Sequence, residues 1–224
     1  MQAELGFFII VGAFALLILS LLAWKKRDDA RGRFIDAYAF PGGIKERVRK
    51  RYPHLSDSDL ELVFGGLRQY LQLSRQAHRR TLAMPSQVVD VAWHEFILFT
   101  RNYRDFCRKA LGRYLHHTPA EAMTSPTEAQ EGIRRAWRLA CAQEGIAPRA
   151  PDRLPLLFAL DDRLRIPDGF RYALNCAAAL AAAQGAAGVT YCASHIGCGS
   201  GGGDGGCSSD SGCSGDGGGC GGGD

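Results

Sequence analysis

The sequence predicts an all-α protein: a single transmembrane helix, a helical globular domain and a glycine-rich tail. Three observations lead to this. Residues 6–24 are uncharged, apolar residues recur at helical spacing through the middle of the chain, and fifteen of the 28 glycines lie from position 197 onward. At 224 residues the chain can bury one core. The expected domains are an anchor (1–24), a basic juxtamembrane linker (25–40), a helical globular domain (41–190) and a disordered Gly/Cys-rich tail (191–224).

The N-terminal apolar run predicts a single membrane span. Nineteen uncharged residues, 6–24, form a helix of roughly 30 Å, the thickness of a bilayer core. No basic residue precedes the run and no small-residue cleavage site follows it, which favours a membrane span over a cleaved signal peptide. Lys25, Lys26 and Arg27 come directly afterwards. This basic flank predicts a single-pass protein of the inner (cell) membrane, with its N-terminus outside and its main domain cytoplasmic.

The globular region is expected to consist of helices without convincing strands. Ser56 and Asp59 have the spacing of a capping box, and Gly145 suits a left-handed helix end. A further helix start is expected at Ser125, and Thr100 is expected to cap a helix. The expected helices cover about residues 44–52, 57–81, 86–99, 101–112, 126–145, 155–164 and, in an alanine-rich stretch, 170–183.

The chain is organised around residues 84–119, its densest block of aromatic and potential ligand side chains. Large aromatic residues at helical spacing are more often core than ligand contacts. Four of them are therefore expected to form the structural core: Trp93, Phe96, Tyr103 and Phe106.

The same block contains candidate metal ligands. The candidates are His94, Cys107, His116 and His117, with Asp90 as an outer-shell partner that could orient His94 four residues later. Imidazole and thiolate are ligands that Zn²⁺ prefers, so zinc is a possible cofactor and no other cofactor is predicted. However, the spacings match no standard zinc motif, and no His-Glu-x-x-His is present.

Two other interpretations of these residues stay open. In the first, Asp90 and His94 are a buried polar pair, Cys107 is a small core residue, and His116 or His117 caps a helix end. In the second, the group is catalytic. The sequence has no phosphate-binding loop, dinucleotide fingerprint or serine-hydrolase elbow, so no catalytic residue and no small-molecule substrate are identified.

The tail holds four Asp and no Lys, Arg or aromatic residue beyond position 196, which argues against nucleic acid as a partner. Its composition predicts disorder. Three interpretations of its cysteines are open: a solvated tail without chemistry, a soft-metal or redox-responsive segment, and a substrate for azole-forming modification. A cytoplasmic location predicts that all eight cysteines are reduced.

Two stretches, MPSQVVDVAWHEFILFTRNYRDFC and GRYLHHTP, together with the YCASHIGCGSGGG entry to the tail, resemble the bacterial branch of the glycine-rich-domain-containing protein family. The resemblance covers about residues 33–224. It implies a helical domain and a glycine-rich terminus but no catalytic residues.

The expected function is therefore a membrane-anchored interaction or scaffold domain with an unknown protein partner. The alternative is a zinc-binding protein, possibly a metal-dependent enzyme, that uses the central His/Cys cluster.

Overall fold

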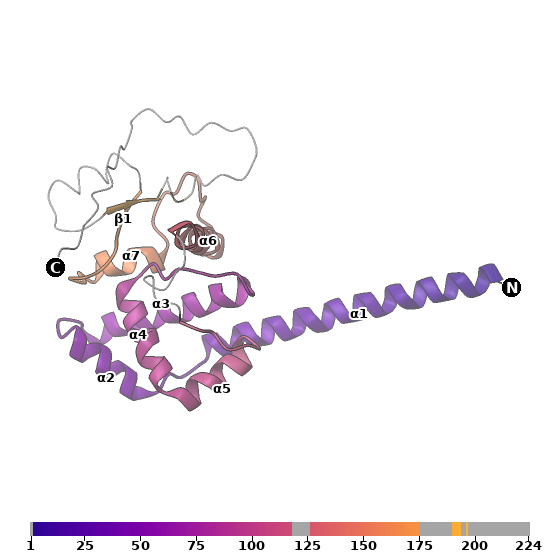
Figure 1. Ribbon diagram of the computed structural model, residues 1–224, viewed down its shortest axis with the longest axis horizontal. Coiled ribbons are helices and arrows are strands. Elements are labelled where there is room, and N and C mark those ends of the chain that lie inside the picture. Colours follow the sequence, from indigo (N-terminus) through magenta and orange to yellow (C-terminus); the bar gives the residue numbers. More distant parts are fainter. Residues whose placement is uncertain (1, 118–125, 175–189, 194–195, 197–224) are drawn as a thin grey trace, which may run out of the picture.

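The computed structural model describes residues 2–117, 126–174, 190–193 and 196, with the side chains of 2–9, 126, 127 and 190 left out. The described part is mainly helical (Figure 1), which confirms the all-α prediction. Its elements are α1 (Gln2–Asp36), α2 (Gly42–Arg51), α3 (Asp57–Gln76), α4 (Gln87–Leu98), α5 (Thr100–Ala110), α6 (Pro126–Glu144), α7 (Leu156–Arg163), β1 (Arg171–Ala173) and β2 (Thr190–Cys192).

Helix α1 is a long arm whose N-terminal part projects away from the body (Figure 1). Large apolar side chains from Ile10 to Trp24 are 41% to 69% exposed along it. Within the described part of the chain, no helix is both long and apolar enough to cross a membrane, which departs from the transmembrane helix predicted over 6–24. Residues 6–9 of that prediction lie outside the described side chains.

The C-terminal part of α1 belongs to the body and packs on α3. The Gln72 side-chain amide donates to the Gly32 carbonyl at 2.8 Å and to the Asp36 carboxylate at 2.7 Å. Arg75 forms an ion pair with Asp28, and Ile35 is fully buried. The stretch expected as a polar linker, 25–40, is thus helical as far as Asp36, because apolar residues within it reach the core.

Helix α3 is the centre of the body and contacts α1, α2, α4, α6 and α7. The predicted capping box is present: Ser56 Oγ accepts from the Asp59 amide, and the Asp59 carboxylate accepts from the Ser56 amide. The helix ends at Gln76, earlier than the predicted 81. His78 adopts a left-handed conformation with φ 54°, which a right-handed helix cannot contain.

Two adjacent glycines of α3 have different surroundings. A Cβ on Gly66 would lie 2.4 Å from Leu160 Cδ1 and 2.9 Å from Val89 Cγ2, so this glycine lets α4 and α7 approach α3 closely. A Cβ on Gly65 would meet nothing within 4 Å. Only Gly66 is therefore required by the packing.

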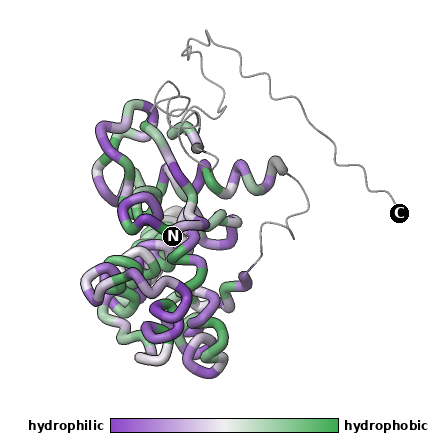
Figure 2. Tube along the Cα trace, turned by 90° about the vertical axis from the view of Figure 1, so that its left-hand side faces the viewer, coloured by the Kyte–Doolittle hydropathy of each residue, from purple (hydrophilic) through white to green (hydrophobic). Residues whose placement is uncertain are grey.

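Helices α4 and α5 contribute most of the aromatic core. Trp93, Phe96, Tyr103 and Phe106 are all buried, and the Phe96 ring lies 5.3 Å from that of Phe106. Thr100 is the first residue of α5 rather than its cap. Hydrophilic and hydrophobic residues alternate along the helices of the body (Figure 2), as expected for helices buried on one face.

The C-terminal part of the body differs from the prediction in one respect. Gly145 ends α6 with φ 68°, as expected, whereas Ser125 lies outside the described residues. Part of the predicted helix over 170–183 is instead strand β1, which pairs in parallel with β2. Each strand has three residues, too few for an alternating pattern to show in the sequence. Residues 175–189 of that region and the tail from 197 onward lie outside the described residues.

The described cysteines fall into two kinds. Cys107 and Cys141 are free and buried. Cys192 is disulfide-bonded, which departs from the prediction that all cysteines are reduced. The other five cysteines lie outside the described residues.

Candidate metal centre

The candidate site begins on α4, whose first turn is fixed by buried polar contacts. Ser86 precedes the helix, and its hydroxyl accepts from the Val89 amide. The Asp161 carboxylate on α7 accepts hydrogen bonds from the Ser86 hydroxyl at 2.7 Å and from the amides of Gln87, Val88 and Phe170. Burial raises the pKa of Asp161, although these hydrogen bonds oppose that shift. Asp161 was not among the residues predicted from sequence, because its three partners at the start of α4 are more than 70 positions away.

Asp90 and His94 lie one turn apart on α4. His94 Nδ1 is 2.9 Å from the Asp90 backbone carbonyl and 3.2 Å from its Oδ2. The His94 side chain is 49% exposed and that of Asp90 is 22% exposed. The helical spacing thus places an imidazole and a carboxylate side by side, as the sequence predicted, but the His94 side chain is at the surface and not buried.

His117 reaches the same place from the segment that follows α5. The Tyr103 hydroxyl donates to the Leu115 carbonyl at 2.5 Å and accepts from Trp93 Nε1 at 3.2 Å. These buried contacts hold the segment against α4. As a result His117 Nε2 lies 3.1 Å from Asp90 Oδ1, with only 14% of its side chain exposed.

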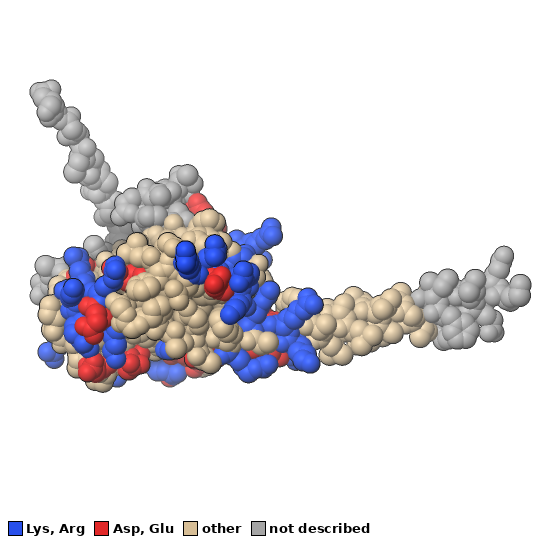
Figure 3. All heavy atoms as spheres, turned by 90° about the horizontal axis from the view of Figure 1, so that it is seen from below, with Lys and Arg blue, Asp and Glu red and all other residues tan. Residues whose placement is uncertain are grey.

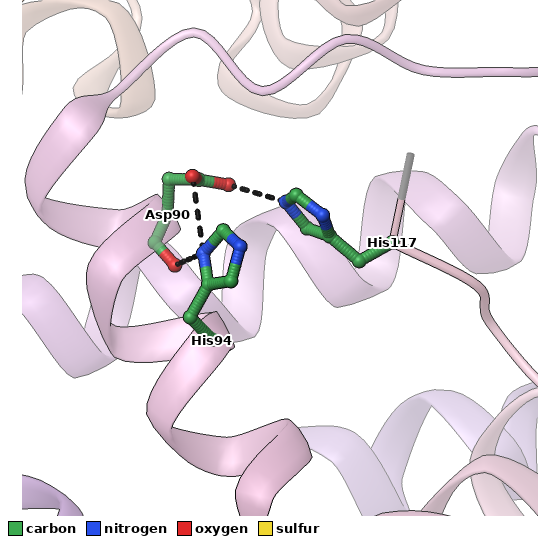
Figure 4. A group of neighbouring side chains, drawn as sticks. All are labelled: Asp90, His94 and His117. Atoms are coloured by element: carbon green, nitrogen blue, oxygen red, sulfur yellow. Dashed lines mark hydrogen bonds and ion pairs between the residues drawn. The ribbon is translucent and has the colours of Figure 1, made fainter. Parts of the chain in front are cut away.

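We call Asp90, His94 and His117 the Asp–His–His group (Figure 4). One ligand atom from each residue lies within 4.8 Å of those from the other two. Ligands on a tetrahedral zinc ion lie about 3.4 Å apart, given bonds of about 2.1 Å. The two Asp–His distances, 3.2 Å to Oδ2 and 3.1 Å to Oδ1 of Asp90, are close to that value.

The other predicted ligands lie elsewhere. Cys107 is 1% exposed in the core, and burial raises the pKa of its thiol, which disfavours the thiolate that binds metal. The His116 ring lies 4.8 Å from the Tyr114 ring and outside the Asp–His–His group. Asp90 was expected in the outer shell, but its carboxylate lies among the potential ligands themselves.

The Asp–His–His group lies in a cleft of about 510 Å³. The walls come from the end of α3 with the loop after it, from α4, and from the segment after α5. Arg79, Arg80 and Arg113 are among the lining residues, and Asp90 is the carboxylate among them. These arginines were not predicted from sequence as part of a site, although Arg79 and Arg80 form an adjacent pair at the end of a predicted helix, shortly before the ligand-rich block.

These features define the class of protein: a helical domain with an Asp–His–His group in a basic cleft. The chain belongs to the UCP032817-like family, whose model matches residues 30–196. That range begins within α1 and includes the whole cleft. No curated protein and no solved structure matches the chain. The family match does not bear on the resemblance to glycine-rich-domain-containing proteins, which stays a prediction.

Proposed function

We propose that the domain binds a divalent transition metal, zinc above all, through Asp90, His94 and His117. One observation carries the proposal: three side chains from two separate segments bring potential ligand atoms within 4.8 Å of one another. Two imidazoles and one carboxylate are a ligand set used by catalytic zinc sites. In contrast to the interpretation from sequence, no thiolate is needed.

The arrangement supports an open coordination sphere. Structural zinc sites have four protein ligands, whereas catalytic sites have three and leave one position for water or substrate. Here three ligands line a cleft, and His94 is about half exposed. A metal held in this way would lower the pKa of a bound water and polarise a ligand oxygen.

The test is zinc content of the full chain, purified in a neutral detergent and measured by elemental analysis. We expect about one zinc per chain, lost in His94→Ala and in His117→Ala. His116→Ala is the matched control, because it removes an imidazole from the same segment outside the Asp–His–His group. It should retain the metal, as should Cys107→Ser.

Two outcomes would reject the metal site. One is a well-folded chain without zinc even after incubation with the metal. The other is zinc that persists in His94→Ala and His117→Ala but disappears in Cys107→Ser. In either case Asp90 and the two histidines would be a hydrogen-bonded polar cluster.

We further propose that α1 anchors the protein to a membrane and that the body is an interaction or scaffold module. The supporting observation is the exposed apolar surface of α1 from Ile10 to Trp24, because transfer of apolar surface from water into a bilayer is favourable.

Alkaline extraction of membranes tests the proposed anchor. The wild-type chain should stay with the membrane, and Leu16→Arg/Leu19→Arg should reduce that fraction. Leu98→Arg, at an exposed leucine on α4, is the control and should have no effect. Equal extraction of all three would reject the anchor.

The proposed orientation places the body in the cytoplasm, on the basis of Lys25, Lys26 and Arg27. The disulfide at Cys192 is the described feature that fits an oxidising compartment better. Protease treatment of intact cells decides between them: a cytoplasmic body is protected, and an external body is digested.

A further inference from the structure

The cleft around the Asp–His–His group has an excess of positive charge. Arg79 and Arg80 are exposed, lie in the loop after α3 and line the cleft. Both guanidinium groups therefore contribute positive charge to the cleft. Arg113 donates to the backbone carbonyls of Ser74 and His78, which ties the end of α3 to the segment that carries His117.

A bound metal would add to this charge. A divalent ion with one carboxylate and two neutral imidazoles keeps a net charge of about +1. The ligand that completes its coordination is therefore favoured if it is an anion.

We propose that the cleft binds a phosphate ester, with its phosphoryl oxygens shared between the metal and Arg79 and Arg80. This rests on the proposed function, because the metal supplies one side of the site. A phosphoryl group has several acceptor oxygens in tetrahedral directions, so it can meet a metal on one side and guanidinium groups on the other. Aromatic side chains of the cleft, such as Tyr114, offer surfaces for the organic part.

Two sources of this group are consistent with the position of the cleft. The Trp24 ring at the end of the exposed apolar segment lies 6.3 Å from the His78 ring, and Arg79 and Arg80 follow directly. Lys and Arg side chains gather where α1 joins the body (Figure 3). A phospholipid headgroup would reach the cleft from this side, and a soluble phosphate ester would reach it from water.

The experiment uses the full chain in neutral detergent, loaded with zinc, and measures phenyl phosphate binding by titration calorimetry. The variant is Arg79→Gln/Arg80→Gln. Its matched control is Arg101→Gln/Arg149→Gln, which changes the net charge equally at two exposed arginines outside the cleft. We expect binding to weaken at least tenfold in the first variant and to stay within about twofold in the control. Zinc content should be the same in all three proteins.

Flotation with phosphatidylcholine vesicles, with and without phosphatidic acid, then separates the sources. A gain in flotation with phosphatidic acid that depends on Arg79 and Arg80 identifies the headgroup, and soluble binding without such a gain identifies a soluble ester. The inference is overturned if neither probe binds, or if both arginine variants behave alike. Failure of the metal site is distinguishable, since it appears as absent zinc before any phosphate is added.

Discussion

Asp90 and His117 are separated by 27 positions, yet the carboxylate Oδ1 of one lies 3.1 Å from the Nε2 of the other. This contact joins α4 to the segment after α5 and completes the Asp–His–His group. A metal at this point would bind the folded state only, because the unfolded chain does not hold the two segments together.

Zinc is therefore expected to stabilise the fold. At a free zinc concentration a hundred times the dissociation constant, the gain is about 2.7 kcal/mol in the free energy of unfolding. Differential scanning calorimetry should show a higher Tm with zinc for the wild type and a much smaller rise for Asp90→Asn. Asp105→Asn, which removes an exposed carboxylate from α5, serves as control and should respond like the wild type. An equal rise in Asp90→Asn would exclude Asp90 as a ligand.

Alanine at the two adjacent glycines of α3 should have opposite effects. Gly66→Ala places a methyl group against Leu160 and Val89 and should cost about 1–3 kcal/mol in the free energy of unfolding. Gly65→Ala enters open space and should gain about 0.5–1 kcal/mol from helix propensity. Urea denaturation of both variants measures this, and equal changes would contradict the close packing of α3, α4 and α7.

Loss of the buried carboxylate at Asp161 should be strongly destabilising. Asp161→Asn leaves too few acceptors for the Ser86 hydroxyl and the three backbone amides, at a cost of about 3 kcal/mol. Its neighbour Asp162 pairs with Arg171 at the surface, so Asp162→Asn should cost less than about 1 kcal/mol. Denaturation curves at neutral pH compare the two. Similar costs would mean that Asp161 does not hold the start of α4.

The same carboxylate predicts a pH dependence. Burial raises the pKa of Asp161, so the folded protein holds this proton more tightly than the unfolded chain. The contribution of Asp161 to stability is full below the ordinary pKa of an aspartate and declines as the pH rises through the raised pKa. The stability difference between the wild type and Asp161→Asn should therefore widen from pH 7 toward pH 4. A difference that does not change with pH would show that the pKa of Asp161 is the same in the folded and the unfolded chain.

Within the described part of the chain, the free cysteines Cys107 and Cys141 should resist alkylation in the folded protein. Burial raises the pKa of Cys141 to about 11 and also raises that of Cys107, which suppresses the reactive thiolate at pH 8. Peptide mapping by mass spectrometry after iodoacetamide treatment at pH 8 should show Cys107 and Cys141 modified only when the chain is unfolded. Modification of Cys141 in the native state should appear only as the pH approaches about 11. Rapid reaction at pH 8 would indicate that these thiols are exposed.

Helix ends that depend on residues close together in the sequence were predictable. The Ser56–Asp59 capping box and the left-handed Gly145 follow from residue types three or four positions apart. The extent of α1 was not predictable in the same way. Charged residues dominate positions 25–33, and the burial of Ile35 depends on helices that are distant in sequence.

The sequence predicted the kinds of side chain in the candidate site, but it did not predict which of those residues come together. His94 and Asp90 were paired by helical spacing, whereas the contact with His117 depends on the buried hydroxyl of Tyr103. Cys107 lies on the buried face of α5 with Tyr103 and Phe106. The spacing of these three residues, three and four positions apart, already indicated that the sulfur of Cys107 faces the core. The arginines of the cleft come from two loops, whose positions only the tertiary fold defines.

Helix α1 runs without a break from its exposed apolar segment into its contacts with α3. The body is therefore rigidly connected to the exposed apolar segment. The rotation of the body about the axis of α1 then fixes the direction in which the cleft opens relative to any surface that binds this segment. A single residue inserted between Trp24 and Asp28 would rotate the body by about 100° around the axis of α1 and displace it by about 1.5 Å along that axis.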